Sequence, residues 1–227
     1  MNRYSSLVTL RLLLLVLAVA CGRVGCAENA SSKVQQQQLP EVHGNKFHYF
    51  GFGSNMLGQR IHVQNPTAVR VGAALVEDYR LDFNDLGGVR WKGAVATIVP
   101  TKGAHVWGTL WEIGVENLAD IDNQEGVHQS LYKPITVNVK LAGQENLLPA
   151  RAYLMVDQPQ SNLHELAPDA VPESRQPSKT YLKVMVVGAI ESGIPNDYVD
   201  FLKRIRHNNR TAEGWEERLT QIKNFQL

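Results

Sequence analysis

The sequence predicts a mixed α+β domain or a small β-barrel domain, on the strength of two observations. About six segments have the composition of strands, with β-branched and aromatic residues in alternating or continuous apolar runs. Helix-like segments are inserted between them without the regular strand–helix alternation of a doubly wound sheet. The chain of 227 residues is long enough to form one sizeable domain.

The expected elements follow one another in a clear order. Strands are predicted at residues 46–52, 68–76, 79–83, 94–99, 105–113, 132–141 and 150–156. Helices are predicted at residues 57–63, 115–125, 178–190 and 195–205, with a charged helix in the tail from residue 211. Pro100 is expected to end one strand, Gly126 to follow a helix end, and Ser178 to cap a helix start. Residues 157–177, with four prolines, indicate a long surface loop.

The overall composition excludes several classes of partner. Hydrophobic residues make up 44% of the chain and charged residues 20%, which is typical of a globular protein. The formal net charge is +1 and the basic residues are scattered, so we expect no nucleic-acid partner.

The amino terminus, residues 1–27, has the layout of a secretory signal peptide. Two arginines flank an apolar run that is too short to span a bilayer, and small residues permit cleavage after Ala20 or Ala27. A signal anchor is the alternative. We expect an extracellular protein without membrane association. Cleavage after Ala27 would remove both cysteines, Cys21 and Cys26, and with them any disulfide or thiol chemistry.

Two further features concern the ends of the chain. Residues 28–46 contain a run of glutamines and indicate a disordered leader, and residues 207–227 form a separate tail. Asn29 and Asn209 begin glycosylation sequons, which are used only in a eukaryotic secretory pathway.

The first candidate site is a glycine turn, residues 51–55, that follows an aromatic strand and precedes a short helix. Such a turn directs backbone N–H groups at one point and attracts anions or carbonyl oxygens. It is not a dinucleotide-binding fingerprint, because Met56 stands where the third glycine belongs. A tight turn with no binding role explains the same residues.

The second candidate is Glu125, at the end of a predicted helix. The negative end of the helix dipole and any burial would raise its pKa, which suits proton transfer near neutral pH. A solvated carboxylate is the alternative. The seven histidines show no His-Glu-x-x-His spacing, so no metal site is expected.

Five motifs in register resemble the gamma-glutamylcyclotransferase family over residues 47–206. They are the Gly-Ser-Asn turn, the Trp-Gly-x-x-Trp strand, the Gln-Glu-Gly-Val helix end, Arg-Ala-Tyr-Leu-Met at 151–155, and Met-Val-Val-Gly-Ala at 185–189 followed by Gly-Ile-Pro at 193–195. The resemblance implies a small mixed β-barrel with inserted helices. It also implies a lyase that forms 5-oxoproline when the substrate's own α-amine attacks its γ-carbonyl, with neither cofactor nor metal.

The resemblance assigns roles to individual residues. Glu125 would be the single proton-transfer group. The substrate would lie along the glycine turn and against three tyrosines, a set that comprises Phe52, Gly53, Ser54, Asn55, Met56, Leu57, Tyr132, Tyr153 and Tyr181. The expected partners are a small gamma-glutamyl substrate and a second copy of the chain in a homodimer. Packed core tyrosines are the alternative for the aromatic positions.

This chain departs from the family pattern at two positions. Phe52 replaces a tyrosine, and Asn123 stands where relatives often carry an acid. A glutathione-specific enzyme, a gamma-glutamylamine-specific enzyme and a catalytically silent binding module are the alternative functions.

Overall fold

The computed structural model describes residues 39–86 and 90–227 of the chain. The predicted signal peptide and Asn29 lie outside them. Within the described residues, six strands form one sheet: β1 (Val42–His43), β2 (Lys46–Gly51), β3 (Val69–Asn84), β4 (Val95–Gly114), β5 (Tyr132–Leu141) and β6 (Leu147–Met155).

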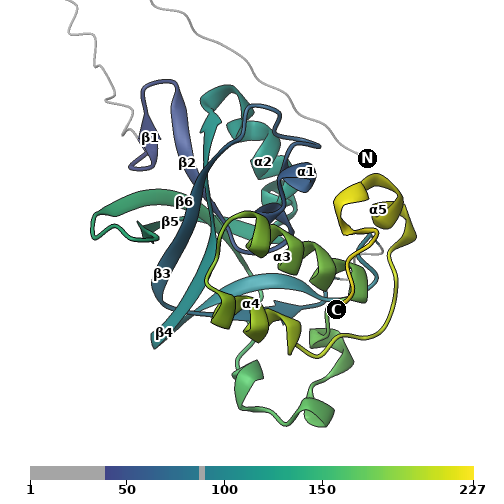
Figure 1. Ribbon diagram of the computed structural model, residues 1–227. Coiled ribbons are helices and arrows are strands. Elements are labelled where there is room, and N and C mark those ends of the chain that lie inside the picture. The colour runs from purple at the N-terminus through teal and green to yellow at the C-terminus, as the bar shows by residue number, and fades with distance from the viewer. Residues whose placement is uncertain (1–38, 87–89) are drawn as a thin grey trace, which may run out of the picture. The chain divides into compact units, whose positions relative to one another are not determined.

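Five of these strands close into a barrel. The strand order is β1-β2-β4-β3-β5-β6, and a further parallel pairing of β2 with β6 joins the two ends of the series β2-β4-β3-β5-β6 (Figure 1). The other pairings are antiparallel, so the sheet is mixed. Strand β1 lies outside the closed set, as a short hairpin on β2. The predicted α+β class with a small mixed barrel is confirmed.

The two longest strands differ from the prediction, because Pro100 does not end β4 but pairs with Tyr79 of β3. A bulge follows, in which residues 101–104 of β4 face the single residue Asp78. The Asp78 carboxylate accepts a hydrogen bond of 2.8 Å from the Gly103 N–H group, which fixes the bulge. A proline is tolerated where the ladder is already interrupted, since no ladder hydrogen bond is lost.

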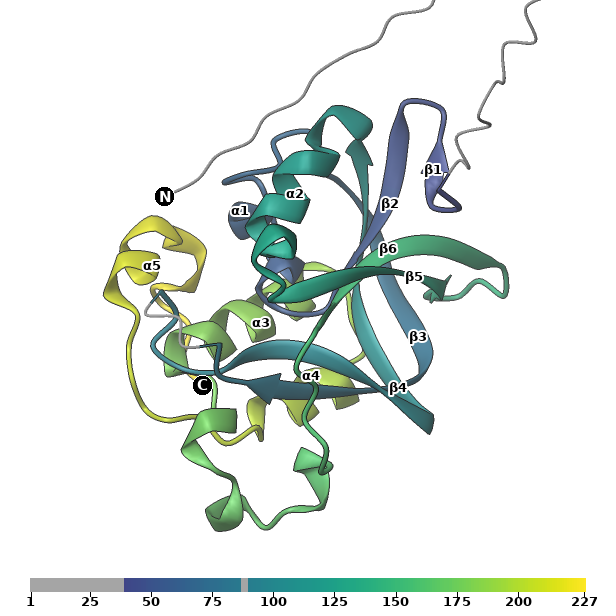
Figure 2. The ribbon, with the colours of Figure 1, turned by 180° about the vertical axis from the view of Figure 1, so that it is seen from behind.

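In the part of the chain that the structure describes, five α-helices accompany the barrel: α1 (Gly58–Ile61), α2 (Leu118–Gln124), α3 (Lys179–Glu191), α4 (Asn196–Lys203) and α5 (Glu213–Arg218). Helices α3 and α4 pack together on one side of the barrel, and α2 lies beside β2 in the view from behind (Figure 2). The predicted cap on α3 is confirmed, because the Ser178 hydroxyl accepts from the Tyr181 N–H group at 3.0 Å. None of the described helices is long and apolar enough to cross a membrane.

The predicted loop 157–177 contains three single 3₁₀ turns, at Leu163–Glu165, Pro168–Ala170 and Glu173–Arg175, and an isolated parallel bridge of Pro177 with Ala94. It is tied to β3 by charged groups. Asp82 is fully buried and accepts hydrogen bonds from Arg80 of its own strand and from Arg175 of the loop. Arg80 also donates to the Pro159 carbonyl at 3.0 Å. These contacts hold the loop against the barrel.

Both expected terminal segments contribute to the fold. Residues 39–46 of the expected disordered leader are ordered, and Glu41 is buried where it accepts from Arg151 at 3.2 Å. In the expected tail, Leu219 and Ile222 are fully buried, and Trp215 stacks on Trp91 with ring centroids 4.6 Å apart. The domain therefore extends beyond residues 47–206 at both ends, because apolar and ionic contacts bind each segment to it.

Candidate active site

The glycine turn is held between β2, β4 and α3. Strand β2 ends at Gly51, and a 3₁₀ turn, Ser54–Met56, follows with Gly53 at its N-cap. Helix α3 approaches closely, since a Cβ atom added to Gly188 would lie 2.4 Å from the Leu57 nitrogen. From β4, the Trp111 indole donates to the Asn55 carbonyl at 3.0 Å. The backbone of the turn is thus fixed from two sides.

Glu125 stands opposite the turn, at the C-cap of α2, and Gly126 follows in the left-handed conformation with φ 65°. Both positions agree with the prediction. One carboxylate oxygen, Oε1, accepts hydrogen bonds of 3.1 Å from the Asn55 amide and 3.1 Å from the Gln124 amide. The second oxygen, Oε2, has no hydrogen-bond partner among the described residues.

The environment of Glu125 changes its acidity. Burial raises the pKa of Glu125 from its ordinary value to about 7, while the Arg60 guanidinium and the amides of Gln124 and Asn55 oppose the rise. The Asp122 carboxylate adds slightly to it. The predicted upward direction is confirmed, with burial as the main cause. A carboxylate with this pKa can accept and return a proton near neutral pH.

A narrow cavity of about 40 Å³ separates Glu125 from the turn. Its lining residues are Tyr49, Phe52, Gly53, Ser54, Asn55, Ala96, Glu125, Tyr132, Tyr153 and Tyr181. The structure therefore brings most of the predicted site residues together from β2, β4, β5, β6, α2 and α3. Met56 and Leu57, also expected to bind substrate, have fully buried side chains that pack in the core, so they do not line the cavity.

The three predicted tyrosines line the cavity while their hydroxyl groups bind protein partners. Tyr132 donates to the Ala96 carbonyl at 2.8 Å, and Tyr181 accepts from the Ala96 N–H group at 3.1 Å. Tyr153 donates to Asp122 and accepts from Arg151 at 2.7 Å. Burial raises the pKa of Tyr132 well above its ordinary value and that of Tyr181 to about 12, so both are neutral at neutral pH. They shape the cavity rather than exchange protons.

Asp122 does not join Glu125 as a second acid. Its carboxylate accepts hydrogen bonds of 2.8 Å and 3.1 Å from Arg151 and another from Tyr153. These partners hold it in an ion pair with Arg151, and among the described residues Glu125 is the carboxyl group that lines the narrow cavity.

Several residues of the site were absent from the sequence prediction, among them Tyr49, Arg60 and Ala96. The Tyr49 hydroxyl accepts from the Asn55 amide at 2.9 Å, which fixes the rotation of that amide. Arg60 is only 5% exposed, lies 4.7 Å from the Trp215 ring, and has a buried Nε without a partner among the described residues. Tyr49 belongs to the aromatic strand before the turn and Arg60 to the helix after it. The sequence therefore places both next to the turn, but it does not show that their side chains point toward the site.

A larger cavity of about 340 Å³ adjoins the narrow one. The two share Ser54, Glu125, Tyr132 and Tyr181, so they form one cleft with a narrow inner end and a wide outer part. The wall of the outer part includes two guanidinium groups and two indole rings, from Arg60, Arg90, Trp91 and Trp215. A ligand whose reacting group sits at Glu125 would extend into this cationic and aromatic region.

The chain is similar to a protein-family model, to proteins of known name and to solved structures. The AIG2-like family model matches residues 105–202. The human protein named gamma-glutamylcyclotransferase is 37% identical over 175 residues, 75% of this chain and 85% of that protein. Its Bos taurus counterpart is 36% identical over 185 residues, 80% of this chain and 90% of that protein. A solved structure entitled "Gamma-glutamyl cyclotransferase" superposes with a TM-score of 0.68 at 35% identity, covering 79% of this chain and 99% of that one.

Proposed function

This chain belongs to the gamma-glutamylcyclotransferase family, as its motifs predicted, and we propose that it converts gamma-glutamyl amino acids into 5-oxoproline and a free amino acid. One observation carries the proposal for the site. The Glu125 carboxylate and the Asn55 amide of the glycine turn meet at 3.1 Å in a cavity shaped for a small group.

The chemistry needs no nucleophile from the protein, because the substrate's α-nitrogen attacks its own γ-carbonyl. Formation of a five-membered ring benefits from a high effective molarity, provided that the chain is held folded in a near-attack geometry. The small volume at the inner end of the cleft, about 40 Å³ and enclosed by aromatic rings, supports such a folded conformation of the glutamyl group.

Glu125 would carry the protons. The α-nitrogen enters as an ammonium group, forms the new C–N bond, and keeps one hydrogen in the lactam. The bond from the γ-carbon to the departing nitrogen breaks, and the two protons lost by the α-nitrogen end on that departing nitrogen, which leaves as an ammonium group. A carboxylate with a pKa of about 7 can take each proton and return it. The free Oε2 is available for this transfer.

The glycine turn would bind the polar groups of the glutamyl moiety. The Asn55 Oδ1 atom is buried and has no partner among the described residues, so a substrate N–H group would satisfy it. The Gly53 and Asn55 N–H groups are candidates to stabilise the developing oxyanion, since the Ser54 N–H group is hydrogen-bonded to the Tyr181 hydroxyl and the Met56 N–H group to the Gly53 carbonyl. Removal of one such donor costs about 3–4 kcal/mol of transition-state stabilisation in well-studied cases.

The outer part of the cleft favours a leaving amino acid that carries a carboxylate. Arg60 and Arg90 contribute positive charge there, and Trp215 offers an aromatic surface. A gamma-glutamyl amino acid would direct its carboxylate toward these guanidinium groups. A gamma-glutamylamine lacks that carboxylate at the same place, and glutathione needs room for a further residue.

A side-by-side comparison of turnover tests this proposal. We expect purified protein to release 5-oxoproline faster from gamma-glutamyl-alanine than from glutathione or gamma-glutamyl-lysine. A preference for either of the latter would establish the narrower specificity instead. Binding of gamma-glutamyl-alanine without any 5-oxoproline would indicate a silent binding module.

Location and assembly are separate proposals supported by the sequence and the family. We propose that residues 1–27 direct secretion, with the mature chain starting at Cys21 or Glu28, and that Asn209, which is exposed, is then glycosylated. Amino-terminal sequencing of protein from the culture medium tests secretion and the cleavage point, and mass spectrometry of the peptide that contains Asn209 tests its glycosylation. An intact Met1 terminus in cytosol would contradict secretion. A homodimer is proposed from the family alone, and sedimentation analysis of the purified protein tests it.

A further inference from the structure

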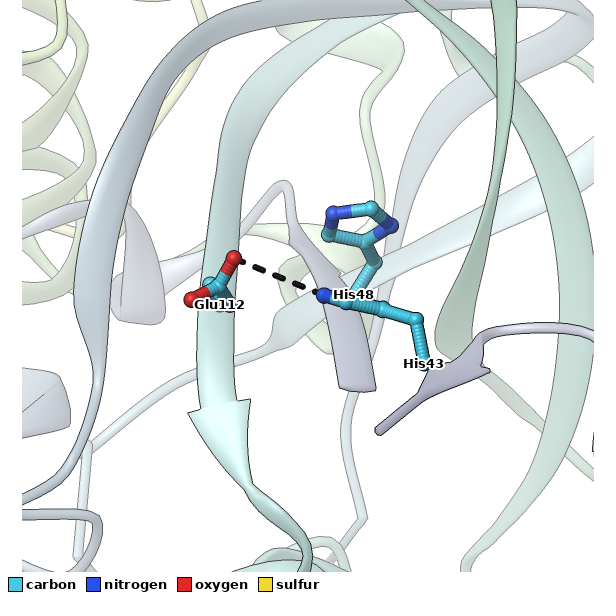
Figure 3. Close-up of side chains that lie close together, drawn as sticks. All are labelled: His43, His48 and Glu112. Atoms are coloured by element: carbon cyan, nitrogen blue, oxygen red, sulfur yellow. Dashed lines mark hydrogen bonds and ion pairs between the residues drawn. The ribbon is translucent and has the colours of Figure 1, made fainter. Parts of the chain in front are cut away.

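Two histidines and a glutamate from three neighbouring strands gather outside the active site. His43 lies on β1, His48 on β2 and Glu112 on β4. His48 pairs directly with Glu112 across the antiparallel ladder, which places both side chains on the same face of the sheet. Figure 3 shows His43 and Glu112 pointing toward one another, with the His48 ring beside them.

The spacing of the three side chains suits a single metal ion. One ligand atom from each residue can be chosen so that all three lie within 4.8 Å of one another. The His43 Nε2 atom and the Glu112 Oε2 atom are 3.4 Å apart. Two ligands of a tetrahedral zinc ion, with bonds of about 2.0–2.1 Å, are separated by about 3.3–3.4 Å. Small rotations of His48, whose ring centroid is 4.2 Å from that of His43, would complete the set.

Backbone carbonyl groups orient both imidazole rings. The His43 Nδ1 atom lies 3.4 Å from the Glu41 carbonyl oxygen. One ring nitrogen of His48 is hydrogen-bonded to the backbone of Pro149, where only a carbonyl group is present because proline has no N–H group. Each ring can therefore donate one N–H group to a carbonyl and keep the other nitrogen free as a ligand. Metal-binding histidines commonly have this arrangement.

We propose that His43, His48 and Glu112 bind a divalent transition-metal ion such as Zn²⁺, with water completing the coordination. Imidazole and carboxylate ligands suit Zn²⁺ far better than Mg²⁺ or Ca²⁺, which prefer oxygen ligands. The competing arrangement is an ion pair of Glu112 with Lys46 and His43. In the metal-bound form His43 would link the β1 hairpin to β4, so binding would stabilise the folded protein.

The site is separate from the catalytic residues. Side chains alternate along a strand, so His48 faces away from Tyr49, which lines the active-site cavity. Loss of the metal ligands should therefore leave 5-oxoproline formation intact. That activity serves as a check that each variant is folded.

Calorimetric titration with Zn²⁺ and thermal unfolding test the proposal, using untagged full-length protein in which Cys21 and Cys26 are replaced by serine. We expect Zn²⁺ to bind with one-to-one stoichiometry and to raise Tm, while Mg²⁺ has no such effect. The variants His43→Ala and His48→Ala should each weaken Zn²⁺ binding at least about tenfold. Mutation of residues that only hydrogen-bond to metal ligands already lowers metal affinity by that factor. His105→Ala, which removes an exposed histidine on another part of β4, is the matched control and should bind as before.

Lys46→Met gives an independent readout. It removes the ammonium group that pairs with Glu112, so Zn²⁺ should bind more tightly than to the parent protein. The proposal is overturned if the parent protein binds no Zn²⁺ at micromolar concentrations. It is equally overturned if the double variant His43→Ala/His48→Ala binds as tightly as the parent.

Discussion

Replacement of Glu125 by glutamine should stabilise the folded protein above neutral pH. Burial raises the pKa of this carboxyl from 4.5 to about 7. A carboxyl group with a raised pKa favours folding in its protonated form. The stabilisation that protonated Glu125 gives to the folded state is fully present below pH 4.5 and is lost as the pH rises through 7. The pKa difference is 7 − 4.5 = 2.5, and each pKa unit is worth about 1.36 kcal/mol. Ionisation of Glu125 therefore lowers the free energy of unfolding by up to about 3 kcal/mol at pH 9.

Glutamine has the same shape and no charge, and its side-chain oxygen can accept from Asn55 and Gln124 as the carboxylate does. The free energy of unfolding of the variant should therefore exceed that of the parent by less than about 1 kcal/mol at pH 5 and by about 3 kcal/mol at pH 9. The latter corresponds to roughly 6–12 °C in Tm for a domain of this size.

Urea unfolding at pH 5, 7 and 9 measures this difference. Glu217→Gln is the matched control, because Glu217 is an exposed carboxylate on α5, and it should change stability little at any pH. The reasoning is refuted if Glu125→Gln is no more stable than the parent at pH 9. A gain of equal size at all three pH values would refute it as well.

Three further predictions follow from contacts of the site. In the parent protein kcat/KM should rise with pH through about 7 as Glu125 loses its proton; a flat profile from pH 5 to 8 would contradict this. Arg60→Met removes the positive charge that lowers the pKa of Glu125, so the rise in kcat/KM should move to higher pH, and a shift to lower pH would be inconsistent with that role. Gly188→Ala places a Cβ atom 2.4 Å from the Leu57 nitrogen and should cost roughly 1–3 kcal/mol of stability in urea unfolding, together with most of the activity, because α3 must move away from the turn. Gly214→Ala is its control, because a Cβ atom added there would meet no atom of the described residues within 4 Å apart from its own helix and chain neighbours.

Local signals predicted most of the fold. Ser178, Gly126 and the alternation in β5 act over a few residues, so the corresponding cap, helix end and strand appear where the sequence placed them. The pattern allowed a barrel but did not decide its closure, because closure depends on the parallel pairing of two distant segments at Tyr49 and Arg151. The continuity of β4 past Pro100 was missed because the bulge that tolerates the proline involves β3.

The site shows the same division between local and distant determinants. Glu125 and the glycine turn are marked by short motifs, and the structure places them within hydrogen-bonding distance. Arg60 is held by residues far along the chain, since its guanidinium lies 4.7 Å from the Trp215 ring and donates to the Gln124 side-chain oxygen. Met56 and Leu57 are next to cavity-lining residues in sequence, yet the turn directs their side chains into the core. The pair His43 and Glu112, 69 positions apart, has no spacing motif at all.

The rate at which Glu125→Gln releases 5-oxoproline from gamma-glutamyl-alanine tests the account most directly. With the fold verified by circular dichroism, the account predicts a fall in kcat of roughly 10²–10⁴-fold, the usual contribution of a general acid–base group. A variant that stays folded and keeps a rate within a few-fold of the parent would contradict the assignment of proton transfer to Glu125.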